Sequence, residues 1–167
     1  DGSTAQGFPF TANGKFQAAP SIVDIQGEKT IFAGNNDKYL YAINSDGSVR
    51  FSLLTGDRVD TSPSFVHING SLNIMFGSRD DQIYAVNMDG NTLPGWPITL
   101  NGNIKGGIVF SDLDANGSPE VITVSDAGTM SVFHLDGTPY HHFPINNSLP
   151  FTGPPMSLDM DGDDDLE

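Results

Sequence analysis

The sequence has no cysteine, so it can form neither a disulfide framework nor a reactive thiolate. Lysine and arginine are scarce too: 7 residues against 21 aspartates and glutamates, for a formal net charge of −14. A chain so poor in positive charge lacks the side chains that neutralise phosphate groups in complexes with nucleic acids or anionic membranes. We therefore expect no nucleic-acid partner, and the acidic surface favours cations.

Long hydrophobic runs are also missing, because no apolar stretch approaches the roughly 18–20 residues that span a bilayer. We therefore expect no membrane insertion. The sequence contains no Gly-x-Ser-x-Gly segment, no phosphate-binding loop and no His-Glu-x-x-His segment. With these signatures lacking, we predict that the chain is not an enzyme.

Tryptophan occurs once and histidine four times. Trp96 lies in a Gly-Trp-Pro triplet, and Phe8 and Phe143 take the same place in two related triplets. Packing explains all three aromatic residues, whereas sugar stacking would explain only Trp96. His141 and His142 are neighbours on an expected strand, so they should face opposite sides and not share a metal. We expect structural roles for these residues, as for the isolated His67 and His134.

What the sequence does contain is a repeat, marked by the dipeptide Asp-Gly. Its copies lie 45, 43 and 47 residues apart, at Asp1-Gly2, Asp46-Gly47, Asp89-Gly90 and Asp136-Gly137. Short apolar segments precede the last three copies, and aromatic-Pro-apolar triplets follow three of the four. A period of this length made of strands and turns is typical of stacked or radially arranged β units.

Each period holds four strand-like segments joined by short connections, which predicts antiparallel hairpins. The expected first strands are 20–25, 63–68, 107–112 and 155–159, and the expected second strands are 30–33, 72–76 and 121–124. The expected third strands are 39–43, 82–86 and 130–134, and the expected fourth strands are 48–53, 93–98 and 139–143. The second strands are nearly all apolar, as in buried strands. Proline in the fourth strands indicates an edge position.

We therefore predict an all-β chain, specifically a β-propeller of four-stranded antiparallel blades. A β-sandwich would explain the strands but not their even repetition. Residues 1–167 form one propeller segment of about three and a half repeats, beginning near 1, 46, 89 and 136. Because the count does not close, we expect either the remaining blades of a larger propeller or self-association through open β edges.

Two loops that follow first strands carry oxygen ligands at positions 1, 3 and 5 and an acid at position 9. They lie 47 residues apart, at the same place in the repeat. A tight loop brings alternate side chains together, and converging carboxylates need a hard cation such as Ca²⁺. We predict calcium as the cofactor, with a peptide oxygen at position 7. The predicted ligands are Asp112, Asp114, Asn116, Ser118 and Glu120, and Asp159, Asp161, Asp163, Asp165 and Glu167.

These loops are not EF-hands, because position 12 of the first is Thr123, inside an apolar strand. In the second loop Asp164 replaces Gly117, at a position that we expect to need a left-handed backbone. The first two repeats have only short turns here, Asp24-Ile-Gln-Gly27 and His67-Ile-Asn-Gly70. We therefore expect metal in some repeats only.

The loop pattern Asp-x-Asp-x-Asn/Asp-Gly-x-x-Glu resembles that of FG-GAP/VCBS-type repeats, which form integrin-α-like β-propellers. The segment 87–98, Asn-Met-Asp-Gly-Asn-Thr-Leu-Pro-Gly-Trp-Pro-Ile, is similar to a run common in secreted bacterial members. Residues 41–47 also resemble quinoprotein-like propeller repeats. The resemblance implies a secreted or periplasmic, bacterial module for binding or adhesion.

Three functions remain open from the sequence. The first, which we favour, is a non-catalytic extracellular calcium-binding propeller that binds a protein or carbohydrate ligand. The second is the propeller portion of a secreted enzyme, such as a polysaccharide lyase, a quinoprotein dehydrogenase or the accessory domain of a hydrolase. The third is a structural subunit that assembles edge to edge.

Overall fold

The computed structural model describes residues 2–25 and 27–157. All regular structure in these ranges is β-strand, and they contain no helix that could cross a membrane. The strands are β1 (Ser21–Ile25), β2 (Glu28–Gly34), β3 (Tyr39–Asn44), β4 (Val49–Leu54), β5 (Ser64–Ile68), β6 (Ser71–Gly77), β7 (Gln82–Asn87), β8 (Ile98–Thr99), β9 (Val109–Ser111), β10 (Glu120–Val124), β11 (Thr129–Phe133) and β12 (Ile145–Asn146).

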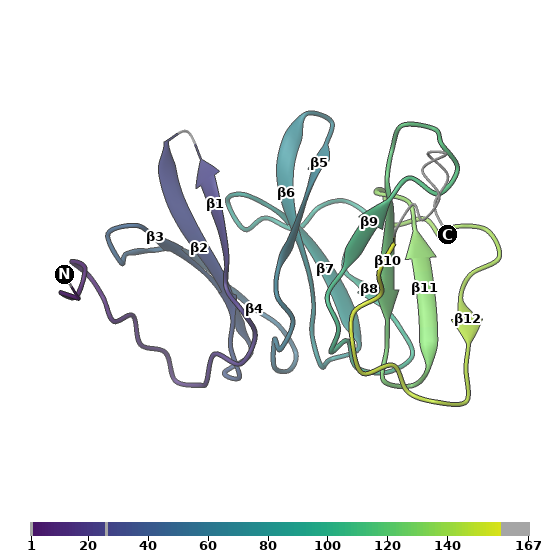
Figure 1. Cartoon of the computed structure of the whole chain (residues 1–167), viewed down its shortest axis with the longest axis horizontal. Coiled ribbons are helices and arrows are strands. Elements are labelled where there is room, and N and C mark those ends of the chain that lie inside the picture. The colour runs from purple at the N-terminus through teal and green to yellow at the C-terminus, as the bar shows by residue number, and fades with distance from the viewer. Residues whose placement is uncertain (1, 26, 158–167) are drawn as a thin grey trace.

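The strands form three four-stranded antiparallel sheets, each built from consecutive strands in chain order. We call them blade 1 (β1–β4), blade 2 (β5–β8) and blade 3 (β9–β12). Figure 1 shows the blades side by side in chain order, with the turns between their first and second strands on one side of the molecule. The all-β prediction and the four-stranded antiparallel organisation are confirmed.

Each blade uses the sequence features expected of its strands. The second strands are the most buried: all five residues of β10 are buried, as are the last three of β2. Gly47, Gly90 and Gly137 have φ between 82° and 87° in the turns that follow the third strands. Residues with a Cβ rarely adopt this left-handed conformation, which explains why the repeat has glycine after each aspartate.

The fourth strands of blades 2 and 3 are shorter than predicted. Residues 93–98 and 139–143 were expected to be strands, but β8 and β12 pair over two residues each. In both segments a turn interrupts the ladder, closed by the Trp96 N–H on the Leu93 carbonyl and by the Phe143 N–H on the Tyr140 carbonyl. Proline in these segments removes further backbone donors. β4 has no proline and forms a six-residue strand.

The hydrophobic cores lie mainly between neighbouring blades. Phe32 and Leu40 of blade 1 pack with Ile74 and Phe76 of blade 2, and all four are fully buried. A second cluster joins blades 2 and 3. Trp96 belongs to it with 7% exposure, and its indole N–H donates to the Leu135 carbonyl at 3.2 Å. The packing role predicted for Trp96 is therefore confirmed.

Close backbone contacts repeat between blades at the glycine before the aromatic-Pro triplet. A Cβ on Gly95 would lie 2.1 Å from the Asp136 carbonyl oxygen in the next blade. Near the N-terminus, a Cβ on Gly7 would lie 1.8 Å from the Asp46 carbonyl oxygen. The segment 7–10 therefore contacts blade 1 as the outer loop of blade 2 contacts blade 3.

The first strand expected at 155–159 is not observed. Residues 155–157 lie outside any strand, and residues 158 and 159 lie outside the described residues. The Ser157 hydroxyl is 2.9 Å from that of Ser111, at the end of β9. This contact places residue 157 beside blade 3, where the next repeat is expected to begin.

Candidate metal centre

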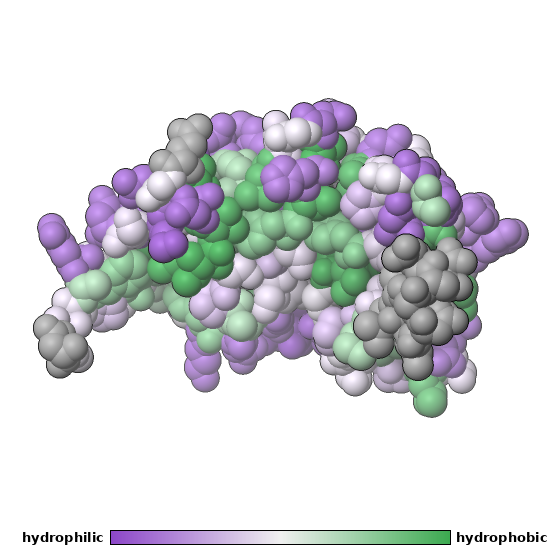
Figure 2. Space-filling model, turned by 45° about the horizontal axis from the view of Figure 1, so that its top comes forward, coloured by the Kyte–Doolittle hydropathy of each residue, from purple (hydrophilic) through white to green (hydrophobic). Residues whose placement is uncertain are grey.

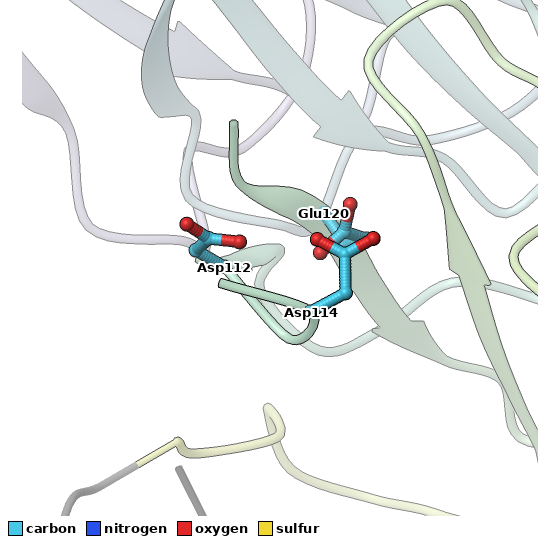
Figure 3. A group of neighbouring side chains, drawn as sticks. All are labelled: Asp112, Asp114 and Glu120. Atoms are coloured by element: carbon cyan, nitrogen blue, oxygen red, sulfur yellow. The ribbon is translucent and has the colours of Figure 1, made fainter. Parts of the chain in front are cut away.

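The first predicted metal loop joins β9 to β10, spanning residues 112–119 between the two strands. Figure 3 shows the carboxylates of Asp112 and Asp114, on the loop, turned toward Glu120 at the start of β10. One carboxylate oxygen from each of these residues lies within 4.8 Å of the others. The structure thus brings together three of the five residues predicted from this loop.

Glu120 is the buried member of the group, with 1% exposure. Its Oε2 accepts a hydrogen bond from the Leu113 N–H at 2.9 Å, and its Oε1 lies 3.3 Å from His134 Nδ1. Desolvation makes a buried carboxylate costly unless charge or hydrogen bonds compensate it. One backbone donor and one imidazole supply part of that compensation, and a cation beside Asp112 and Asp114 would supply more.

Hydrogen bonds within the loop hold the other carboxylates in place. The two oxygens of Asp112 accept from the N–H groups of Asn116 (3.0 Å) and Gly117 (2.7 Å). Gly117 has φ 86°, as the sequence predicted for this position, and Ala115 has φ 55°. Two left-handed residues in one short loop curl the backbone around the Asp112 side chain.

Asn116 and Ser118 have a different arrangement from the carboxylates. The side-chain oxygen of Asn116 accepts the Ser118 N–H at 2.8 Å, so it caps the turn. Both residues are exposed. The second predicted site, at Asp159, Asp161, Asp163, Asp165 and Glu167, lies outside the described residues.

The electrostatics of the loop are strongly negative. Tyr140 is buried near the loop, and the pKa of its phenol is raised. The largest cause is burial, and the charges of Asp114, Glu120 and Asp112 follow. A cation would reduce this potential. The donor set fits Ca²⁺, which takes 6–8 oxygen ligands, because three carboxylates can supply up to about six.

Sequence reasoning missed the partner of Glu120. His134 was interpreted as an isolated residue, yet it stands beside Glu120 in the third blade. The same cross-strand pair is Thr30 with Asn44 in blade 1 and Asn73 with Asn87 in blade 2. Comparing the blades position by position would have revealed that only the third blade places an acid here.

His141 and His142 also differ from the prediction. They lie in the turn that interrupts the outer strand, so the alternation expected of a strand does not apply. Their rings are 4.8 Å apart at 74°, and the His141 ring lies 4.2 Å from that of Tyr140. The pair therefore takes part in an aromatic group on the outer side of blade 3.

No protein-family model and no curated protein sequence matches the chain. Solved structures do. BamB from Moraxella catarrhalis superimposes with a TM-score of 0.64 at 14% identity, covering 86% of this chain and 43% of BamB. This chain folds as blades of a β-propeller. The computationally designed Ika4 protein is similar too, with TM-score 0.62, 15% identity, and coverage of 86% of this chain and 80% of Ika4.

BBS1N, solved in complex with ARL6DN, gives a TM-score of 0.56 at 14% identity and covers 80% of this chain. The propeller blades described here span 41% of the BBS1N chain and 43% of the BamB chain. At such low identities the likeness concerns the fold alone.

Proposed function

We propose that this chain is a calcium-stabilised, non-catalytic propeller module that binds a protein or carbohydrate ligand outside the cell or in the periplasm of a bacterium. One observation carries the proposal: the carboxylates of Asp112, Asp114 and Glu120 converge at a loop, and Glu120 is 1% exposed. The FG-GAP/VCBS-type resemblance of the loop supports the same interpretation.

In this proposal the ion acts on structure. Bound calcium supplies the positive charge that offsets three carboxylates, one of them desolvated. Asp112 and Asp114 hold the loop side of the site, and Glu120 holds the strand side. The ion would therefore tie the loop to the first residue of β10, at the entrance to the most buried strand of blade 3.

A thermal melt with calcium and then with a chelator tests the proposal. Ligand that binds only the native state stabilises it by about 2.7 kcal/mol at a hundredfold excess over Kd. We expect the melting temperature to rise with calcium, and Asp112→Asn and Asp114→Asn to remove the rise. Asp89→Asn is the matched control, since its carboxylate lies 72% exposed on blade 2. If calcium has no effect on the unmodified chain, the metal proposal is wrong.

The second predicted loop adds a question of stoichiometry. Calorimetric titration of the full chain with calcium should give two sites, one removed by Asp112→Asn and the other by Asp161→Asn. A single site that only Asp112→Asn abolishes would mean that Asp159, Asp161, Asp163, Asp165 and Glu167 do not form a site in this chain.

A second candidate function, assembly with further blades, is favoured by the open face of blade 1. A hollow of about 250 Å³ there is lined mainly by apolar side chains, including Phe10, Phe16, Ile31 and Ile43. Ile22, on the first strand, is 61% exposed. In blade 2 the residue that corresponds to Ile31, Ile74, is fully buried against blade 1.

Sedimentation at several protein concentrations tests the assembly candidate. Self-association through this face predicts a mass that rises with concentration and that Ile31→Asp reduces to the monomer. Lys29→Asp, on the same strand with a 69% exposed side chain, is the control. A monomer at every concentration would exclude assembly by the chain alone.

A further inference from the structure

A hollow of about 840 Å³ opens between blades 2 and 3, on the side of the molecule that carries the metal loop. Figure 2 looks toward this side, where hydrophobic side chains gather in the middle and hydrophilic ones at the rim. Sites for small molecules commonly enclose about 300–1,000 Å³. Blade 2 contributes the β5–β6 hairpin and residues 93–94 to its lining, and blade 3 contributes residues 117–119 and 134–136.

The hollow exists because this gap between blades is built differently from the one before it. Between blades 1 and 2, the Arg50 side chain crosses the gap and donates to the Met88 carbonyl at 3.0 Å and to Asp89 at 3.3 Å. Arg50 stands four residues after Asp46, and the equivalent residue after Asp89 in blade 2 is Leu93, which is followed by Pro94. Neither side chain carries a hydrogen-bond donor. In this gap the carbonyl equivalent to that of Met88, that of Leu135, instead accepts the Trp96 indole N–H at 3.2 Å. No long side chain fills the space beside Leu93, and the hollow lies there.

The two walls are unequal in length and both are polar. One wall is the β5–β6 hairpin, with His67 in β5, Asn69 in the turn and Ser71 at the start of β6. The other includes residues 117–119 of the metal loop, which is longer than the corresponding turns of the other blades. The side chains of His67, Asn69, Ser71 and Ser118 make no hydrogen bond with any described residue. The hollow thus presents imidazole, amide and hydroxyl groups that are free to bind a ligand.

The remaining lining defines the ligand's charge. Leu93, Pro94 and Leu135 provide apolar surface beside these polar groups. None of the lining residues is lysine or arginine, and Asp136 contributes a carboxylate. No lining side chain therefore offers the fixed positive charge that binds a phosphate or an acidic sugar, and the net charge of the chain is −14. Neutral sugars match the lining, because their hydroxyls bond to amides and imidazoles while their C–H faces contact apolar side chains.

We propose that this hollow is a binding groove for a neutral oligosaccharide, with His67 and Asn69 on one wall and Ser118 on the other. The inference rests on the proposed function in one respect: the Ser118 wall belongs to the loop that calcium would hold. It goes further by naming the site and the class of ligand.

A panel of neutral tetrasaccharides (cello-, malto-, xylo-, manno- and chito-oligosaccharides) should be titrated into the full chain with saturating calcium, followed by NMR or calorimetry. We expect at least one to bind, and His67→Ala and Asn69→Gly to weaken it by about tenfold or more, equivalent to about 1.4 kcal/mol. Glycine suits position 69, where φ is 51°. His141→Ala, an exposed histidine on the outer turn of blade 3, is the control.

Three results would overturn the proposal: no binding by any member of the panel, equal binding by the His67 and Asn69 variants, or tighter binding of tetragalacturonate or tetralysine. The melting temperature with calcium is recorded on the same samples. Calcium stabilisation without saccharide binding overturns only the groove, whereas saccharide binding without calcium stabilisation overturns only the metal proposal.

Discussion

Glu120 is the central residue of the proposed metal site, because its carboxyl group is almost completely buried. The corresponding residues in the other blades, Thr30 and Asn73, are buried but neutral. An acid in this environment is unfavourable unless its partners compensate it. This contrast between equivalent positions is a residue-scale argument for a bound cation.

Replacing Glu120 with glutamine should therefore abolish the calcium-dependent rise in melting temperature. Without calcium, the free energy of unfolding of the variant should differ from that of the unmodified chain by no more than about 1–3 kcal/mol. The substitution removes a buried acid, and the glutamine oxygen can still accept the Leu113 N–H. Thermal melts with calcium and with chelator measure both quantities. A calcium response equal to that of the unmodified chain would show that Glu120 is not a ligand.

Two tyrosine–aspartate pairs repeat in blades 1 and 2. The Tyr41 hydroxyl donates to Asp37 at 2.8 Å, and the Tyr84 hydroxyl donates to Asp80 at 2.6 Å. Burial and then the hydrogen bond to Asp37 raise the pKa of Tyr41 from 10.0 to about 12. Burial and then the hydrogen bond to Asp80 raise the pKa of Tyr84. Blade 3 has neither member of the pair, with Ala127 and Ser131 in these positions.

These pairs predict alkaline sensitivity. A phenol whose pKa is higher in the folded than in the unfolded chain stabilises the fold fully below about pH 10 and loses this contribution as pH rises toward 12. We expect Tyr41→Phe to make the free energy of unfolding fall less steeply over this range. Denaturant titrations at a series of pH values test this, with Tyr39→Phe as the control, and equal slopes would contradict it.

At the scale of elements, the contacts between blades depend on glycine at specific turns. Gly95 has φ 84° and lies against the Asp136 carbonyl, whereas Gly70 has φ 76° with open space around it. The two glycines therefore share a left-handed backbone but differ in what surrounds them. They allow backbone strain to be separated from the contact between blades.

We expect Gly70→Ala to cost about 1–2 kcal/mol, the usual penalty of a left-handed alanine. Gly95→Ala should cost more, about 2–4 kcal/mol, because its Cβ would also collide with blade 3. Chemical denaturation of both variants measures the difference. Equal losses would mean that the blades move apart without penalty.

The elements were predictable to different degrees. Inner strands such as β2 and β10 followed from their apolar runs, and the Asp-Gly turns followed from the repeat. The outer strand of blade 1 was predicted to within one residue, but those of blades 2 and 3 were overestimated. In blade 2, Pro94 and Pro97 remove donors and the Leu93–Trp96 turn interrupts pairing. Hydrophobic patterning does not show where the hydrogen bonds between two strands end, because residues beyond that point can have the same alternating pattern.

Ion pairs near the linkers show a further regularity that the spacing of the repeat did not predict. Asp60 pairs with Arg79 in blade 2, and Lys105 pairs with Asp126 at 2.7 Å in blade 3, so the signs are exchanged. An equivalent backbone hydrogen bond lies beside each ion pair. The Arg79 N–H donates to the Arg58 carbonyl, and the Asp126 N–H donates to the Asn103 carbonyl. The backbone geometry is retained while the side-chain charges differ between blades.

At the scale of the whole molecule, the net charge is −14, and a single Asp→Asn substitution changes it by only one unit. Self-repulsion destabilises a compact acidic chain, and salt screens it over a Debye length of about 10 Å at 0.1 M. A general benefit from cations must therefore be distinguished from binding at one loop.

We expect sodium chloride to raise the melting temperature of the unmodified chain and of Asp112→Asn equally. At constant ionic strength, calcium should add a further rise only in the unmodified chain, and magnesium should add less because it requires near-octahedral geometry. Melting curves in matched buffers provide the comparison. An equal calcium response in both proteins would attribute the effect to screening.

The amino-acid order was sufficient for the fold class, the strand order within each blade and the position of an acidic loop between β9 and β10, because these depend on local periodicity and spacing. It was insufficient for the contact of His134 with Glu120, for the capping role of Asn116 and for the groove beside Ser118. Those features depend on distances across strands and between blades. Such distances are set by packing of whole sheets, to which residues far apart in the chain contribute together.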